Sequence, residues 1–295
     1  MWFRNLQIYR ITSGNITPNS LEETLSQHTL QPCTQMEMQS RGWLPPRDEQ
    51  PNFVLAFGQH WLIALGIEKK LLPAAVISQH AKARIVNFEQ VQGYRVSKKQ
   101  VRDIKEATIL ELLPRAFAQR HKTYAWIDAV NNRLILDTVS ASKAEEFIEV
   151  LLKTVPEIKL VPLDTKVSPS TAMTRWLSGD DLSSAFTVDR DCELQGMSDE
   201  KETIKYTCHT LDAEETGRHI RAGKKAIKLA MTWDSKISFV LQDNLQLRRI
   251  APQDILKEST ESDEDRFVSD FTIMTGELSQ LITEVIEALG GEDRD

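Results

Sequence analysis

The fold class is decided by Lys225-Ala-Ile-Lys-Leu-Ala-Met-Thr-Trp233, Asp234-Ser235, Lys236-Ile-Ser-Phe-Val-Leu-Gln242, Asp243-Asn244, Leu245-Gln-Leu-Arg-Arg-Ile250. This stretch contains three short, largely apolar runs that are separated by two-residue connections of Asp, Ser and Asn. Such connections form the tight turns between neighbouring antiparallel strands. The stretch therefore predicts a three-stranded antiparallel β-meander.

Further hairpins and helices surround the meander. Asn52–Gly58 and His60–Ile67 predict one hairpin, and Thr123–Val130 and Arg133–Thr138, on either side of Asn131-Asn132, predict another. We expect further strands at Phe3–Ile11, Ile158–Val161 and Ile204–Leu211, and helices at Pro18–Leu30, Ala74–Val91, Ser97–Gln119, Ser140–Thr154, Asp212–Ala222 and Phe267–Leu289. Residues 31–51 are expected to form a loop, and the pattern of the polar stretch 178–202 leaves its form open. This mixture predicts an α+β fold with antiparallel sheets and packed helices.

The order of these elements predicts three parts. Residues 1–72 and 119–165 form a central α+β domain, residues 73–118 a helical arm, and residues 166–295 a C-terminal α+β domain with the meander and a long acidic helix. In the arm, apolar side chains from Val101 to Ala116 recur at helical spacing and need a neighbour to cover them. Since the arm cannot cover this stripe by itself, we expect it to protrude from the rest of the chain towards a neighbour.

The composition of the 295 residues is that of an ordinary globular protein, with 41% hydrophobic and 27% charged residues and a net charge of -7. It excludes a collagen-like chain, a disulfide scaffold and a wholly disordered chain. No apolar run reaches the roughly 20 residues of a membrane span, and the N-terminus does not resemble a signal peptide. Three scattered cysteines suit a reducing compartment, so we expect a cytoplasmic protein without membrane contact.

The charges are segregated along the chain. Lys69–Lys122 holds twelve Lys and Arg against four acids, a net charge of +8, and Arg218–Arg249 has a net charge of +6. Asp254–Asp295, in contrast, has a net charge of -10. Two basic segments on an acidic body suit a protein that attracts a polyanion to one surface, although solvated helix faces with paired charges produce the same pattern.

The basic segments supply the candidate DNA contacts. These are Arg95, Lys98, Lys99, Arg102, Lys105, Arg115, Arg120, Lys122, Lys224, Lys225 and Lys228. Since no zinc-finger spacing or RNA-binding aromatic motif is present, we expect contacts to phosphates without sequence preference. Neighbouring aromatic residues could stack on bases, but their spacing favours the core: Phe88, Tyr94, Phe117, Tyr124 and Trp126.

Nucleotide, cofactor and metal motifs are not found. The segment Gly217–Lys225 has five residues between its glycines and no Ser or Thr after the lysine, so it does not match a P-loop. Cys208-His209 has no ligand pair at zinc-binding spacing. We therefore expect no cofactor and no bound metal.

Two alternatives to DNA binding alone remain. An acid at a strand end, Asp137, followed by Glu157-Ile-Lys159 is the weak signature of a metal-dependent nuclease, in which two carboxylates hold Mg²⁺ and the lysine stabilises developing charge. The second alternative is a protein-only interaction module whose basic faces meet acidic partners.

Six stretches in one order resemble the bacterial recombination-associated protein RdgC family and extend over essentially the whole chain. They are Met1-Trp-Phe-Arg-Asn-Leu-Gln-Ile-Tyr-Arg10, Gly42-Trp-Leu-Pro-Pro46, Leu112-Leu-Pro-Arg-Ala-Phe117, Trp126-Ile-Asp128, Ala222-Gly-Lys224 with Lys228-Leu-Ala230 and Trp233, and Met274-Thr-Gly-Glu-Leu278.

The resemblance implies a non-enzymatic, nucleoid-associated protein. It implies a ring-shaped homodimer with a basic central hole that binds double- and single-stranded DNA without sequence preference and restrains the RecA recombinase. The two basic segments would line the hole, and Lys224 and Lys228 match family positions. Arg120 and Lys122 lie in a run that is either a subunit contact or a DNA contact.

Overall fold

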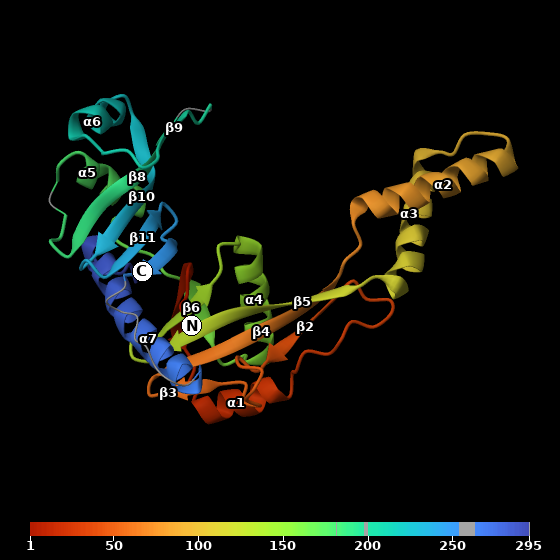
Figure 1. Ribbon diagram of the computed structural model, residues 1–295, viewed down its shortest axis with the longest axis horizontal. Helices are drawn as coiled ribbons and strands as arrows, with labels where there is room; N and C mark the ends of the chain where they lie inside the picture. The colour runs from red at the N-terminus through yellow and green to blue at the C-terminus, as the bar shows by residue number, and fades with distance from the viewer. Residues whose placement is uncertain (181, 198–199, 254–262, 295) are drawn as a thin grey trace. The chain divides into compact units, whose positions relative to one another are not determined.

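The computed structural model (Figure 1) describes residues 1–180, 182–197, 200–253 and 263–294. The chain divides into two compact units. Unit 1 comprises Met1–Pro18, Leu55–Leu62 and Tyr124–Asp295, and unit 2 comprises Asn19–Val54 and Ile63–Thr123. Strands and helices occur in both units, and the strand pairs that have a register are antiparallel, so the predicted α+β class is confirmed.

Unit 1 is built on an antiparallel sheet. Along the sheet the strands follow the order β5 (Ala118–Asp128, from Tyr124 on), β6 (Arg133–Asp137), β1 (Leu6–Ser13), β12 (Leu247–Pro252), β11 (Ile237–Gln242), β10 (Lys224–Trp233), β8 (Phe186–Gly196) and β9 (Thr203–Tyr206). Strand β7 (Lys159–Pro162) also pairs with β1, and β3 (Leu55–Phe57) pairs with the first residues of β4 (His60–Lys70). The predicted meander and both predicted hairpins are thereby confirmed.

The meander of β10, β11 and β12 has one face in the core. Alternate side chains such as Met231, Trp233 and Phe239 are buried with helices α5 (Pro169–Leu177) and α7 (Asp263–Ala288). Helix α7 contributes residues that include Met274 and Leu278 to the same core. Because successive side chains of a strand point to opposite faces, the residues between these apolar ones form a second face, which neither helix covers.

Two further helices of unit 1 begin at the residues that the sequence predicts. Ser140 accepts a hydrogen bond from the backbone of Lys143 and so caps α4 (Ala141–Thr154). Asp212 caps α6 (Ala213–Arg221) through the N–H of Glu214. Gly223 follows α6 with φ 89°, which suits a residue without a side chain and turns the chain into β10.

Unit 2 contains α1 (Pro18–Ser26, from Asn19 on), β2 (Gln39–Leu44), most of β4, the start of β5, and the helices α2 (Ala74–Gln92) and α3 (Lys98–Leu112). Gly42 explains part of the Gly-Trp-Leu-Pro-Pro run. A Cβ at position 42 would lie 2.4 Å from backbone atoms of Leu30, which cannot move aside. The glycine therefore lets Trp43 exchange backbone hydrogen bonds with His28 and Leu30.

Helices α2 and α3 pack against each other with little buried surface. Ala81 is the buried residue of α2, and Thr108 is that of α3. Ser97 and Gln100 form a reciprocal capping box at the start of α3, as the sequence predicts for Ser97. The apolar stripe of α3 thus has α2 as its neighbour, but the pair still leaves large apolar side chains exposed.

The structure corrects the sequence expectations for a loop and for a helix end. Residues 31–51 contain strand β2 instead of a loop only, because sheet pairing rather than local apolar content stabilises this polar segment. The stretch 178–202, whose form the sequence left open, contains strand β8. The helix expected to reach Gln119 ends at Leu112, since Pro114 lacks the N–H that would continue it and β5 begins at Ala118.

No helix in the described parts of the chain has the length and apolar character that crossing a membrane requires.

Candidate nucleic-acid interface

The predicted DNA contacts fall into three groups. We define the arm cations as the six in and around α3: Arg95, Lys98, Lys99, Arg102, Lys105 and Arg115. The strand cations are Arg120 and Lys122 on β5, and the remaining three predicted residues, Lys224, Lys225 and Lys228, lie on β10. The first two groups belong to unit 2 and the third to unit 1.

The arm cations are all exposed. Lys98, Arg102 and Lys105 are spaced four and three residues apart, which places them on one side of α3. Arg102 is the one arm cation with an ion pair among the described residues, 3.7 Å from Glu106 on the next turn. Surface pairs of this kind contribute little, so these charges remain available to an external anion.

The start of α3 is unusual in its charge. Lys98 and Lys99 occupy its first turn, which holds no acidic residue. The N-terminus of a helix carries a partial positive charge, so two cations there cost roughly 0.3–1 kcal/mol each. Helix stability therefore does not account for these two lysines.

The strand cations are tied to unit 2 itself. Arg120 donates from two nitrogens to one carboxylate oxygen of Glu68, at 3.3 and 2.8 Å. The backbone N–H of Cys33 and the Arg120 guanidinium hold the pKa of Glu68 below its ordinary value. Lys122 donates to Asp48 at 2.5 Å and to the Pro45 carbonyl at 2.9 Å.

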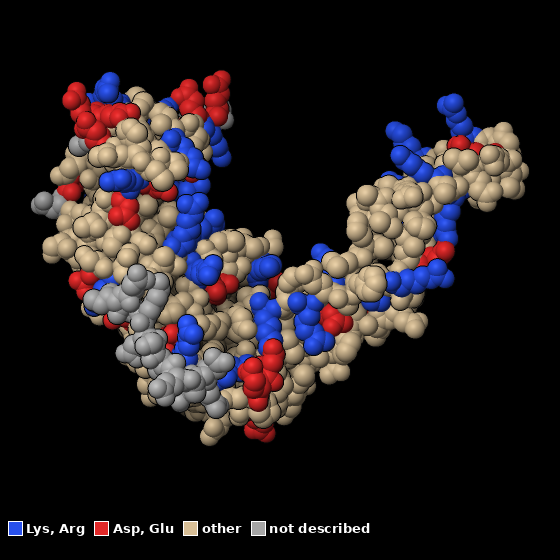
Figure 2. Space-filling view, viewed as in Figure 1, with Lys and Arg blue, Asp and Glu red and all other residues tan. Residues whose placement is uncertain are grey.

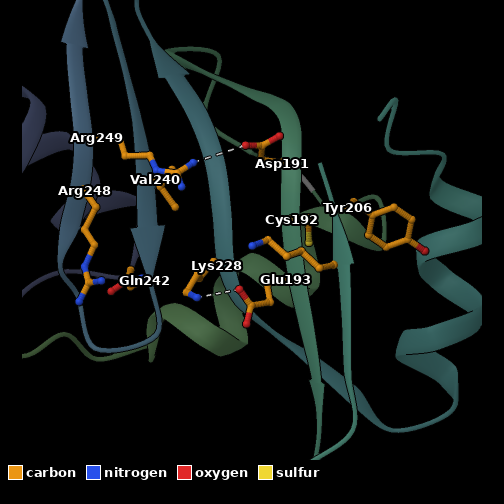
Figure 3. Close-up of a pocket in the computed structure, with 10 residues that line it drawn as sticks. Asp191, Cys192, Glu193, Tyr206, Lys228, Val240, Gln242, Arg248 and Arg249 are labelled. Atoms are coloured by element: carbon orange, nitrogen blue, oxygen red, sulfur yellow. Dashed lines mark hydrogen bonds and ion pairs between the residues drawn. The ribbon is translucent and has the colours of Figure 1, made fainter. Parts of the chain in front are cut away.

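The uncovered face of β9, β8, β10, β11 and β12 is called the meander face here (Figure 3). The register places Lys205, Glu193, Lys228 and Gln242 in one row across four strands. A cavity of about 140 Å³ lies on this face, and Arg248 and Arg249 of β12 also line it. Figure 2 shows Lys and Arg gathered along this side of unit 1.

Acidic side chains are interleaved with the cations of the meander face. Lys228 lies 2.7 Å from Glu193, and Arg249 lies 3.7 Å from Asp191. Figure 3 shows Lys228 and Glu193 on the neighbouring strands β10 and β8, whereas Arg249 of β12 reaches Asp191 of β8 across the two strands between them. An incoming phosphate therefore has to compete with carboxylates that already contact the cations.

The other two predicted β10 lysines differ in their surroundings. Lys224 lies 2.6 Å from Glu202, and this contact lowers the pKa of Glu202. Lys225 is exposed. The sequence prediction omitted Lys205, Arg248 and Arg249 from the candidate contacts. The basic charge of Arg248-Arg249 can be recognised in the sequence, but its position on the same face as Lys228 depends on strand register.

The aromatic residues near the basic segments separate into two classes. Trp126 is fully buried and donates its indole N–H to Nδ1 of His60 at 3.2 Å. Phe117 and Tyr94, in contrast, are 84% and 61% exposed. The expectation that these residues belong to the core is thus confirmed for Trp126 and wrong for Phe88, Tyr94 and Phe117, which are exposed.

The residues of the nuclease alternative do not form one site. Asp137 pairs with Leu6 at the start of β1, whereas Lys159 pairs with Ser13 at its end. Seven residues of extended strand separate these positions by roughly 23 Å. The Asp137 carboxylate accepts backbone hydrogen bonds from Arg4 and Asn5, and burial raises its pKa.

The described cysteine and acidic side chains do not form a metal-binding site either. Cys192 faces the core, and burial raises the pKa of its thiol to about 12. Within the described ranges, no cluster of three or more His, Cys, Asp or Glu could hold a metal ion.

Comparisons with known proteins assign the chain to a protein family. A family model described as "Putative exonuclease, RdgC" matches residues 1–292. The "Recombination-associated protein RdgC" of Herminiimonas arsenicoxydans is 45% identical over 297 residues, which is 99% of both chains. The proteins of that name from Cupriavidus pinatubonensis and Bordetella pertussis are 46% and 42% identical over 99% and 100% of both chains. The chain therefore belongs to the RdgC family, whose curated relatives are named for recombination.

Proposed function

We propose that this chain is a DNA-binding protein that contacts backbone phosphates without sequence preference, acts as a homodimer and restrains a RecA-type recombinase. The observation that carries the proposal is the exposed group of arm cations on α3. A second basic surface, the meander face, supports it. Lysine and arginine side chains of this kind suit contacts to backbone phosphates, which carry no sequence information.

The homodimer is supported by apolar side chains of unit 2. Several that belong to α2, α3 and their connections are exposed: Val86, Val91, Tyr94, Leu110 and Phe117. Val91 is 81% exposed and Phe117 84%. Exposed apolar groups of this size mark interaction surfaces, and a second copy of the same pair of helices would cover them in a two-fold contact. A ring that encloses DNA requires a second such contact.

A binding role explains the arrangement around Asp137 better than hydrolysis does. Its carboxylate holds two backbone N–H groups, and its supposed partner Lys159 pairs at the other end of β1. We therefore propose that the protein is not a nuclease, although the family model carries an exonuclease description.

Restraint of a recombinase follows from occupancy of DNA. A protein that covers the phosphates of a strand competes with the filament that a recombinase must assemble on the same strand. The names of the curated relatives associate them with recombination and support this role.

The test is a binding titration on unrelated duplexes and single strands at two salt concentrations, with and without Mg²⁺. We expect equal affinity on every sequence, a steep loss of affinity with salt, and DNA that remains intact. Mg²⁺-dependent cleavage that Asp137→Ala abolishes would support the nuclease alternative instead. Absence of binding at low salt would support a protein-only interaction module.

The dimer has its own test in light scattering after size-exclusion chromatography. We expect the mass of two chains. Val91→Asp combined with Phe117→Asp should shift the protein towards one chain, whereas Val139→Asp, an exposed position on unit 1, should not. An unchanged mass in the double variant would exclude this face as the subunit contact.

A further inference from the structure

A second cavity of unit 1 lies where the N-terminal residues meet β12 and α7. Its volume is about 730 Å³, within the usual range for ligand pockets. Three arginines from three parts of the chain line it: Arg4, Arg249 and Arg266. Trp2 and the last three residues of β12, Ile250 to Pro252, supply an apolar wall. The cavity thus combines guanidinium groups with an aromatic surface.

The backbone that carries Trp2 and Arg4 is fixed from several sides. The Asp137 carboxylate accepts the N–H groups of Arg4 and Asn5 at 3.1 and 3.0 Å. The Arg4 carbonyl accepts the N–H of Ile250 at 2.9 Å. Asp137 is therefore a positioning residue for this segment, and the cavity wall is organised before any ligand arrives.

The single carboxylate among the lining residues has a partner. The Asp270 carboxylate lies 2.7 Å from the N-terminal ammonium of Met1. This contact neutralises Asp270 and also anchors the first residue to α7. Arg4 and Arg266 consequently give the cavity a positive character, whereas the Arg249 guanidinium also lies 3.7 Å from Asp191.

Arg249 connects the cavity with the meander face. It lines both cavities, and its side chain is 76% exposed. Its φ of 54° lies in the left-handed region, where residues other than glycine are rare and often functional. The Asn5 side chain accepts its backbone N–H at 3.4 Å. This conformation bends β12 so that one guanidinium can reach an anion that passes from one cavity to the other.

We infer that this cavity binds one nucleotide unit of an unpaired DNA strand, with the base against Trp2 and the phosphate at Arg4 and Arg266. The inference rests on the proposed DNA binding and extends it. Guanidinium groups bind phosphate in a planar fork, and tryptophan stacks on any base. An acidic peptide would use the arginines but would leave the aromatic wall without a role.

The primary experiment compares a 15-nucleotide oligo-dT strand with a blunt duplex of the same length in fluorescence anisotropy titrations. The test protein is the full chain with Arg4→Ala and Arg266→Ala, both exposed positions. We expect its affinity for the single strand to fall roughly tenfold and its affinity for the duplex to change less than twofold. Arg294→Ala, which is 77% exposed, is the matched control and should change neither.

Photocrosslinking identifies the contact directly. An oligo-dT strand with one 5-iododeoxyuridine should crosslink to Trp2 in the wild-type protein. The yield should fall in the Arg4→Ala, Arg266→Ala protein. Trp2→Phe, which keeps a ring in place, should move the crosslink to another residue or abolish it without loss of folding.

Each other outcome overturns the inference. Equal losses on both DNAs would reduce the cavity to a backbone contact, and unchanged affinities or crosslinks outside the cavity would exclude it. Polyglutamate that competes as well as oligo-dT would assign the cavity to an acidic peptide. If the wild-type protein binds DNA and the variants bind the single strand as tightly as the wild type does, this inference fails but the proposed DNA binding stands. If the wild-type protein binds neither DNA, the proposed function fails as well.

Discussion

The arm cations and the meander face contain the same residue types but hold them differently. On α3, Lys98, Lys99 and Lys105 are exposed, and the one ion pair that the group forms with described residues, Arg102 with Glu106, lies on the helix surface. On the meander face, neighbouring strands place a carboxylate directly beside Lys228. The comparison shows that local charge in a sequence overstates how much of that charge an external anion can use.

The physical reason lies in the geometry of the two elements. A helix points its side chains outwards, and each surface pair is solvated and weak. A sheet brings side chains of adjacent strands within about 5 Å, so a lysine and a glutamate at paired positions meet whether or not they are near in sequence. We therefore expect the helix to provide most of the affinity for DNA and the sheet to provide less.

The largest expected effect is on the arm. Reversal of charge at Lys98, Arg102 and Lys105 to Glu should lower affinity for any duplex roughly 100-fold and reduce the slope of log affinity against log salt by about three. Anisotropy titrations at four NaCl concentrations measure both. Reversal at three exposed lysines of unit 1, Lys143, Lys153 and Lys159, is the charge-matched control. An equal loss in the control would mean that net charge, rather than the arm, determines binding.

A smaller loss of DNA affinity is expected from a substitution on the meander face. Lys228→Ala should lower affinity only about fivefold, because phosphate must displace Glu193 from a contact of 2.7 Å before it gains the lysine. The loss should be similar on unrelated sequences. A loss as large as that of the arm triple variant would show that Glu193 does not compete.

A substitution of Glu193, the ion-pair partner of Lys228, should have the opposite effect on DNA affinity. Glu193→Gln keeps the size of the side chain and removes its charge, so Lys228 becomes available and affinity should rise about threefold. The gain should disappear in the double variant with Lys228→Ala. A gain that persists there would be due to general charge and not to this pair.

The smallest effect on DNA affinity, less than twofold, is expected for Arg120→Ala, because its guanidinium contacts Glu68. Its effect should be on stability instead, a loss of about 1 kcal/mol in the free energy of unfolding, since Arg120 is half exposed and the pair is partly screened. Urea unfolding monitored by tryptophan fluorescence measures it.

The pH dependence of this loss has a defined sign. The pKa of Glu68 in the folded protein is below its ordinary value of about 4.3, so its contacts stabilise the fold above that pH, and this stabilisation is lost as pH falls through the folded pKa. The difference between wild type and Arg120→Ala should therefore be full at pH 7 and shrink below about pH 4. A difference that grows on acidification would contradict this role of Glu68.

Much of the fold could be predicted because it depends on local signals. Two-residue turns predict the meander, Ser97 and Ser140 predict helix starts, and alternation predicts strands. Strand β8 was not predicted, since it is polar along much of its length and forms only because β10 and β9 pair with it. The candidate site was predictable only as charge. The positions of Lys205 and Arg249 on the same face as Lys228 depend on register and on a bulge, which follow from no local pattern.

The sequence by itself determined the fold class, the helix caps, the segregation of charge and, through six separate stretches, the family. The tertiary structure decided which cations are available, because pairing across strands joins residues that are 35 positions apart, as in Lys228 and Glu193. It also decided that Asp137 and Lys159 lie at opposite ends of β1. The physical reason is common to both: periodicity and propensity act over a few neighbouring residues, whereas an ion pair or a binding site depends on distances in space that only the packed chain fixes.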